Sequence, residues 1–305
     1  MNNKCAILST LAYFDLFQYP LTERELYYFL SRTLSPREFE HALGELVLEG
    51  HIYTWEGLYT VRNEPALIPR RRQGNAMAAD MLRVAEKVAA FLARFPFVRG
   101  VGVSGSLSKQ YADEKSDIDF FIITAPNRLW IARTFLHVLK KLSFLIRRED
   151  WFCMNYFVDE AALEIPEKNL YTAVEIVTLL PMRGTHAFTA FGTANGWTDQ
   201  WLPNSHGRFV LSQDEPPSWS KRVLEGMWNN ALGDWLDRWL MRLTASRWGQ
   251  KRIRGRLNNR GVPMSLDATR HSARPDPTGF QRGLLDAYEK RVAQLTQSFL
   301  RKEMI

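Results

Sequence analysis

The stretch VGVSGSLSKQYADEKSDIDFFIIT, residues 101–124, decides how the middle of this chain folds. A short hydrophobic segment leads to Gly105, and after a polar loop a second hydrophobic segment opens with Asp117-Ile118-Asp119. Side chains of a strand alternate between its two faces, so Asp117 and Asp119 point the same way while Ile118 points to the core. The stretch therefore predicts two strands, with a pair of carboxylates where the second strand begins.

The paired acids indicate a site for a divalent cation. Two neighbouring carboxylates repel each other unless a cation lies between them, and Mg²⁺ prefers oxygen ligands of this kind. Gly105 would let a phosphate approach the backbone, and the N–H groups and hydroxyl of Ser106 can donate hydrogen bonds to its oxygens. Lys109 lies one turn further along and can add a positive charge, although a solvated surface lysine is an equally good interpretation.

These residues resemble the signature of the polymerase-beta-type nucleotidyltransferase superfamily. In that family a Gly-Ser pair follows a strand, and an Asp-hydrophobic-Asp motif opens the next strand after a short loop. Here Gly105-Ser106 and Asp117-Ile118-Asp119 match the two halves of the motif. The resemblance implies that the Gly-Ser pair binds the triphosphate of an NTP and that the paired acids hold two Mg²⁺ ions. It also implies that an acceptor hydroxyl attacks the alpha-phosphorus and that pyrophosphate leaves.

The resemblance covers roughly residues 76–164 and departs from the family pattern in one place. The family usually carries a third carboxylate on a later strand, where it ligates the catalytic metal. The corresponding strand here, residues 152–158, contains no acid, and Asn155 offers only a weaker carbonyl oxygen. Either Glu164 or Asp159 fills the catalytic role from a shifted position, or the third ligand is missing. An ordinary exposed glutamate is the commoner interpretation of Glu164.

Residues 1–68 predict a separate domain that resembles a winged helix-turn-helix fold. The pattern is three helices followed by a hairpin over residues 51–62, and a capping box of Ser35 and Glu38 starts the third helix. The third helix of such folds usually reads DNA. Here its polar positions are mostly acidic, and phosphates repel acids. We therefore expect a packing or protein-contact role, and DNA binding is not expected.

The remaining chain predicts two further regions. Residues 69–200 form the nucleotidyltransferase-like domain, and residues 201–305 form a C-terminal helical region. Residues 63–75 predict a linker, because they contain prolines, a glycine and several arginines. Residues 246–278 predict a basic loop between two amphipathic C-terminal helices. The expected fold class is α/β (α+β), with a small mixed sheet flanked by the winged-helix-like domain and the helical region.

Composition places the chain among ordinary globular proteins. Of its 305 residues 46% are hydrophobic and 24% are charged, which excludes disordered and collagen-like classes. Two cysteines, Cys5 and Cys153, cannot make a disulfide framework, and this favours a reducing compartment. The sequence has no membrane-spanning apolar run, and no signal-peptide cleavage pattern follows the N-terminus. We therefore expect a cytoplasmic protein.

The formal charge of +7 has one main source. Seven basic residues and no acid lie between positions 242 and 266, and they equal the whole excess. A solvated basic loop is the simplest interpretation. The functional alternative is a flap over Asp117 and Asp119 that contacts a triphosphate or an anionic acceptor such as RNA.

The sequence thus predicts a magnesium-dependent enzyme that moves a nucleoside monophosphate from an NTP to an acceptor hydroxyl. The acceptor is open and could be a small molecule, a protein or RNA. Two other functions stay open. One is a catalytically impaired binding or regulatory module on the same fold, and the other is a winged-helix regulator that binds nucleic acid.

Overall fold

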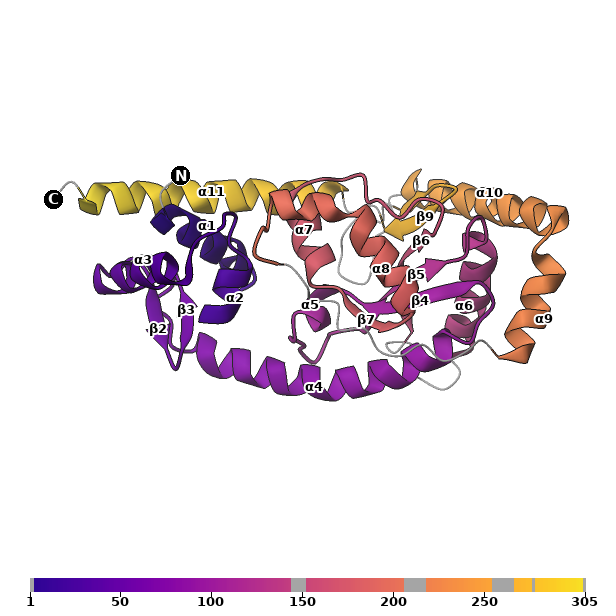
Figure 1. Cartoon of the computed structure of the whole chain (residues 1–305), viewed down its shortest axis with the longest axis horizontal. Helices are drawn as coiled ribbons and strands as arrows, with labels where there is room; N and C mark the ends of the chain where they lie inside the picture. The colour runs from indigo at the N-terminus through magenta and orange to yellow at the C-terminus, as the bar shows by residue number, and fades with distance from the viewer. Residues whose placement is uncertain (1–2, 144–151, 206–217, 254–265, 276–277, 304–305) are drawn as a thin grey trace.

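The structure is a computed structural model that describes residues 3–143, 152–205, 218–253, 266–275 and 278–303. The molecule is elongated in Figure 1, with the N-terminal helices at one end and helices α9 (Trp219–Trp228) and α10 (Ala231–Ile253) at the other. Two long helices, α4 (Leu67–Leu92) and α11 (Thr278–Glu303), run along opposite sides. Among the described residues, no helix combines the length and the apolar character that crossing a membrane requires.

The first elements form an N-terminal body of three helices and a small sheet. The predicted order of three helices and a hairpin is confirmed, and a short strand completes an antiparallel sheet of order β1-β3-β2. A capping box starts the third helix, because the Ser35 hydroxyl accepts from the Glu38 N–H while the Glu38 carboxylate accepts from the Ser35 N–H. The elements are α1 (Asn3–Asp15), β1 (Leu21–Thr22), α2 (Glu23–Tyr28), α3 (Pro36–Leu48), β2 (Tyr53–Trp55) and β3 (Leu58–Thr60).

The linker predicted over residues 63–75 is wrong for most of its length, because α4 already begins at Leu67. Pro69 does not stop the helix, since it lies in the first turn, where its missing N–H is not needed. Arg71 is buried rather than solvated. Its guanidinium pairs with Glu25 at 2.8 Å and lies 3.7 Å from the centre of the Tyr19 ring. One continuous helix therefore joins the N-terminal body to the rest of the molecule.

A six-stranded mixed sheet forms the centre of the remaining chain, which confirms the mixed helix-and-sheet class. The strand order is β7-β4-β5-β6-β9-β8, and only β5 and β6 are parallel. The three strands predicted from the sequence are confirmed as β4, β5 and β6. The strands are β4 (Val98–Val103), β5 (Asp119–Thr124), β6 (Cys153–Asp159), β7 (Leu180–Arg183), β8 (Leu266–Ala268) and β9 (Ser272–Pro275).

Three strands of the sheet were not predicted. One is β7. The other two, β8 and β9, lie inside the segment 246–278 that predicts a basic loop, and helix α10 also continues into this segment as far as Ile253. Both strands are short, and they are recognised by their pairing: β9 pairs with β6, and β8 pairs with β9. Residues 254–265 and 276–277 of the same segment lie outside the described residues. The sequence also predicts a helix over residues 129–146, and residues 144–146 of it lie outside the described residues.

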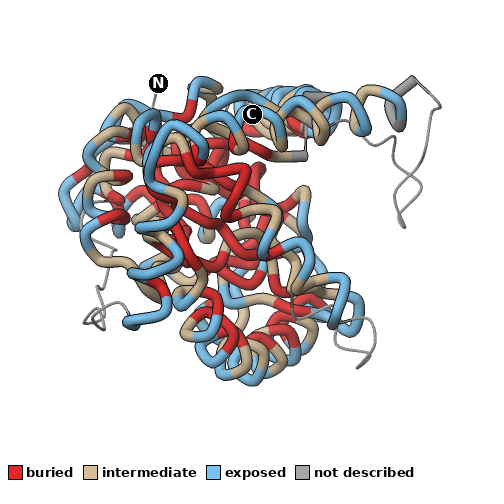
Figure 2. Tube along the Cα trace, turned by 90° about the vertical axis from the view of Figure 1, so that its right-hand side faces the viewer, coloured by how far each residue is buried: buried red, intermediate tan, exposed pale blue. Residues whose placement is uncertain are grey.

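Helical segments follow β5 and β6 in the sequence: α6 (Leu129–Ser143), α7 (Leu170–Val177), α8 (Thr185–Ala194) and the 3-10 helix η3 (Gly196–Gln200). Residues of β5 alternate between hydrophobic clusters on the two faces of the sheet. Phe120 and Ile122 pack with α4 and α6, whereas Phe121 and Ile123 pack with α8. Both faces are therefore buried, which explains the uninterrupted hydrophobic run in this strand. Figure 2 shows the buried residues running through the centre of the molecule.

The two C-terminal helices have different neighbours. Helix α10 packs against α6, whereas α11 packs along α1 of the N-terminal body. The Arg291 guanidinium pairs with the buried Asp15 carboxylate at 2.8 Å, and the Tyr288 ring contacts the Tyr13 ring edge-on. Leu284 of α11 and residues of α7 belong to the same hydrophobic cluster as the N-terminal helices.

One buried carboxylate of α10 fixes the start of α6. Asp237 is 3% exposed and accepts hydrogen bonds from the backbone N–H groups of Trp130 (2.8 Å) and Ile131 (2.9 Å). These groups lack partners within their own helix. Burial raises the pKa of Asp237 to about 6, the nearby Asp159 also raises it, and the two N–H donors and Arg128 lower it.

This pKa predicts a measurable pH dependence. In the unfolded chain an aspartate ionises near pH 4, so between about pH 4 and 6 the folded state binds more protons and loses stability as the pH rises. Asp237→Asn keeps an acceptor oxygen but cannot ionise. We expect the free energy of unfolding of the variant, relative to the parent, to rise by roughly 2–3 kcal/mol across this window. Urea titrations at several pH values test this, and a constant difference from pH 4 to 7 would contradict it.

Candidate functional site

The predicted motif folds into one compact corner at the end of β4. After the strand, Ser104 precedes the short helix α5 (Gly105–Ser108). The backbone N–H of Ser104 donates to the carbonyl of Asp119 at 2.9 Å, and its hydroxyl lies 3.2 Å from the same oxygen. The two halves of the motif are thereby fixed to each other, although a loop separates them in the sequence. Ser106 is exposed in the second position of α5.

Gly105 is required at its position. Its φ of +72° lies in the left-handed region, which disfavours residues with a Cβ atom. A Cβ atom added there would lie 3.1 Å from the Asp119 Oδ2 atom. The bare backbone of the loop therefore faces a carboxylate of the acidic pair.

The acidic pair lies where β5 begins. Ile118 is buried at 1% exposure, whereas Asp117 and Asp119 on either side of it are half-buried. The alternation expected from the sequence is therefore present. Both acids also act on Cys153 and raise the pKa of its thiol. The two carboxylates thus share one neighbourhood at the start of β5 and β6.

Cys153 occupies the position beside Asp119 on the neighbouring strand. The register of the parallel pair sets Asp119 opposite Cys153. Burial raises the pKa of this thiol to about 12, and Asp119 adds to the shift, whereas Lys140 of α6 opposes it. The thiol is therefore protonated at neutral pH and is a poor metal ligand in that form. The hydrophobic segment 152–158 predicts that Cys153 is a buried strand residue, but it does not predict this contact.

Asp159 lies at the opposite end of β6 from Cys153. Six residues of extended strand separate the two, which is about 20 Å. The Asp159 carboxylate is fully buried and accepts from the backbone N–H groups of Asn127 (3.0 Å) and Ala161 (2.9 Å). It also lies 2.9 Å from His271 Nδ1. Asp159 therefore secures the far end of the strand and cannot reach the acidic pair.

Glu164 lies in the loop between β6 and α7, although its place between Leu163 and Ile165 predicts a short strand. Its carboxylate is exposed and pairs with Lys168 at 2.5 Å. Within the described ranges, no three His, Cys, Asp or Glu side chains are grouped closely enough to hold a metal ion together. No contact therefore supports the predicted catalytic role of Glu164.

Lys109 contacts a carboxylate that the sequence analysis missed. Its ammonium group donates to Glu175 Oε1 at 2.7 Å and to the carbonyl of Gly105 at 3.1 Å. Burial raises the pKa of Tyr171, and Glu175 and then Asp119 raise it further, so this ring lies near both acids. A sequence signal did exist, because Glu175 is the one acid of α7 and shares a helix face with Tyr171 four residues earlier.

The donor set fits Mg²⁺ in its usual form. Mg²⁺ in phosphate-transfer sites is commonly held by one or two carboxylates, with waters and substrate phosphates as the other ligands. Asp117 and Asp119 supply the carboxylates, and the backbone of Gly105 lies next to the Asp119 carboxylate. The site therefore suits a metal that arrives with a phosphorylated substrate.

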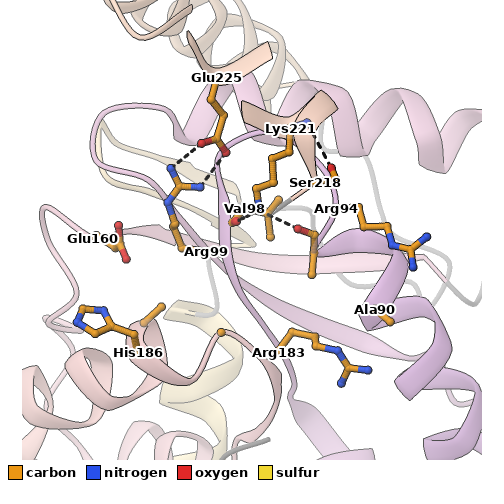
Figure 3. Close-up of a pocket in the computed structure, with 13 residues that line it drawn as sticks. Ala90, Arg94, Val98, Arg99, Glu160, Arg183, His186, Ser218, Lys221 and Glu225 are labelled. Atoms are coloured by element: carbon orange, nitrogen blue, oxygen red, sulfur yellow. Dashed lines mark hydrogen bonds and ion pairs between the residues drawn. The ribbon is translucent and has the colours of Figure 1, made fainter. Parts of the chain in front are cut away.

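Two cavities flank the sheet at a distance from each other. One of about 390 Å³ lies at the start of β4, one strand length from the acidic pair (Figure 3). In it Arg99 pairs with Glu225 at 2.8 Å, and the Lys221 ammonium group donates to the carbonyls of Ala93 and Val98. The other cavity, of about 580 Å³, lies between the N-terminal body, α4 and α5, and Lys109 forms part of its wall.

Comparisons of the chain with protein-family models, curated proteins and solved structures find no match in any of the three.

The Lys109–Glu175 pair predicts a coupled stability effect. Lys109→Met leaves a largely buried carboxylate without its partner, so we expect the free energy of unfolding to fall by about 1–2 kcal/mol. Adding Glu175→Gln removes that unpaired charge and should restore part of the loss. Urea unfolding of the single and double variants measures this, with the exposed Lys115→Met as control. Strictly additive effects of the two substitutions would show that the pair is not coupled.

We predict that Gly105→Ala destabilises the fold. The alanine must adopt a left-handed conformation with its Cβ against the Asp119 carboxylate, so we expect a loss of roughly 1–2 kcal/mol in the free energy of unfolding. Gly44→Ala is a matched control, because that helical position has open space around it and should gain about 0.5–1 kcal/mol. Thermal and urea unfolding report both variants. A neutral Gly105→Ala would contradict the close approach.

Proposed function

We propose that this chain is a magnesium-dependent nucleotidyltransferase that moves a nucleoside monophosphate from an NTP to an acceptor hydroxyl. One observation carries the proposal: the bare backbone of Gly105 directly faces the carboxylate of Asp119. A phosphate held by that loop would lie next to the acidic pair. The resemblance of the motif to polymerase-beta-type nucleotidyltransferases supports the same activity.

Each residue of the corner has a role in this proposal. Asp117 and Asp119 would hold Mg²⁺, which when bound supplies neutralisation of charge on the attacking and leaving oxygens. The backbone at Gly105 and the exposed Ser106 would bind the phosphates by hydrogen bonds. Lys109 is predicted to add a positive charge for the phosphates, and Glu175 balances that charge. We assign it a positioning role, in which its bond to the Gly105 carbonyl steadies the loop.

The acceptor is proposed to enter by the cavity of about 580 Å³ beside Lys109. Its wall is mainly apolar and combines Phe14 and Tyr19 of the N-terminal body with Arg83 of α4. Sites of this size and character suit small organic ligands. In this proposal the N-terminal body is a winged-helix-like domain that completes a substrate cavity, and its acidic third helix fits a role other than DNA binding.

A second candidate function is a binding or regulatory module on the same fold. The observation that favours it is Cys153, a protonated thiol where a neighbouring carboxylate would be expected to assist the acidic pair. Such a module would bind a magnesium–nucleotide complex and not turn it over. The two functions differ only in whether pyrophosphate is released.

The acidic pair is tested by Asp117→Asn and Asp119→Asn. Each variant removes one negative charge from the predicted Mg²⁺ site, so we expect the affinity for each Mg·NTP to fall at least tenfold while the fold survives. Calorimetric titrations with Mg²⁺ and with EDTA measure this, and Glu114→Gln, an exposed acid of the same loop, is the matched control. Unchanged affinity in both variants would refute the proposal.

The enzyme and the binding module are separated by a turnover assay. Purified protein is incubated with each labelled NTP and Mg²⁺ in the presence of small metabolites, protein or RNA from a cell extract. Pyrophosphate release with label transferred to one fraction supports the enzyme. Tight Mg·NTP binding with no pyrophosphate in any mixture supports the binding module.

A further inference from the structure

Helices α9 and α10 lie at the end of the molecule farthest from the N-terminal body (Figure 1). Several of their large hydrophobic side chains are exposed. The most exposed side chain is Trp219, at 78%. We call this surface the α9–α10 face. Its members are Trp219, Val223, Leu224 and Met227 of α9, and Leu232, Trp235 and Trp239 of α10.

The spacing shows that this surface is one continuous side of each helix. On α10, Leu232 is followed by Trp235 and Trp239 at intervals of three and four, so the three share a face. The rings of Trp235 and Trp239 stack, with centroids 6.4 Å apart and an interplanar angle of 14°. The opposite side of α10 packs against the rest of the molecule, since Asp237 and Leu240 contact the region around α6. The exposed side is left without a partner among the described residues.

The charges of the two helices are segregated. The three acids between residues 219 and 247 are engaged inward. Glu225 pairs with Arg99, Asp234 pairs with Arg128, and Asp237 caps α6.

Three basic residues of α10, Arg238, Arg242 and Arg247, are exposed instead. Arg238 and Arg242 each lie three positions after one of the stacked tryptophans, so they flank the apolar stripe, and Arg247 is exposed further along. The outer surface therefore combines tryptophan, aliphatic side chains and positive charge, and its acids are neutralised from within.

We propose that the α9–α10 face docks on an anionic lipid membrane, with both helices lying in the plane of the interface. Tryptophan prefers the boundary between headgroups and acyl chains, and aliphatic side chains gain by entering it. Arginines beside such a stripe attract anionic headgroups. The proposal rests on this surface alone and does not depend on the nucleotidyltransferase activity.

Two other occupants explain less of the surface. Single-stranded RNA would stack on Trp235 and Trp239 and pair with the arginines, but it would leave the aliphatic side chains of α9 uncovered. A second copy of the chain in a two-fold contact would bring Arg238 and Arg242 close to their own counterparts, which like-charge repulsion opposes. A membrane accommodates all three components of the surface together.

Co-sedimentation of the full chain with lipid vesicles tests the proposal. We expect binding to vesicles of phosphatidylcholine with phosphatidylserine, little binding to phosphatidylcholine alone, and a blue shift of tryptophan fluorescence in the bound state. The double variant Trp235→Ser, Trp239→Ser should weaken binding to the anionic vesicles at least tenfold. Arg238→Gln with Arg242→Gln should weaken it and reduce its dependence on salt.

A matched control separates this surface from general stickiness. Leu48→Ser alters a side chain that is 88% exposed on α3, at the other end of the molecule, and should leave vesicle binding unchanged. All substituted residues are exposed, and thermal unfolding checks that each variant folds. The proposal is overturned if the chain does not bind anionic vesicles or if Leu48→Ser weakens binding equally. It is also overturned if the tryptophan substitutions instead abolish binding to a single-stranded RNA, or abolish a concentration-dependent dimerisation of the chain.

Discussion

The hydrogen bond from the Ser104 N–H to the Asp119 carbonyl is the constraint on which the candidate site depends. It joins the end of β4 to the start of β5 across the loop between them. The two strands are paired along their length, and Gly105 follows this bond in a left-handed conformation against the Asp119 carboxylate. The buried Ile118 fixes the same point from the core side. The acidic pair is thus positioned by the sheet rather than by a flexible loop.

Much of the sheet could be predicted, because its central strands carry the signal in their own sequence. Strand β5 is buried on both faces, so its hydrophobic run is unmistakable, and capping residues such as Ser35 mark helix starts locally. Strands β8 and β9 could not be predicted, since β9 forms by pairing with β6 and β8 by pairing with β9. The error at residues 63–75 has the same origin. The arginine at position 71 is buried by partners that lie far away in the sequence.

The residues of the candidate site also fall into those that the sequence predicts and those that it does not. Gly105 and Asp119 were predictable because a motif within one short stretch contains both. Glu175 and Cys153 were not, because their contacts follow from the packing of α7 and from the register of β6. Local sequence therefore located the centre of the site, and tertiary structure determined what surrounds it. The third carboxylate of the family pattern, which this sequence does not match, belongs to those surrounding residues.

The packing of α11 along α1 has a consequence for how the chain acquires its structure. Phe299 and Leu284 belong to the same buried cluster as the first helix, and Arg291 pairs with Asp15. During synthesis α1 leaves the ribosome long before α11 exists. Part of the apolar surface of α1 therefore stays uncovered until α11 has been made. Contacts of such long sequence separation slow folding, because a large loop has to close before they form. The N-terminal body is therefore made before the central sheet and is among the last parts to be completed.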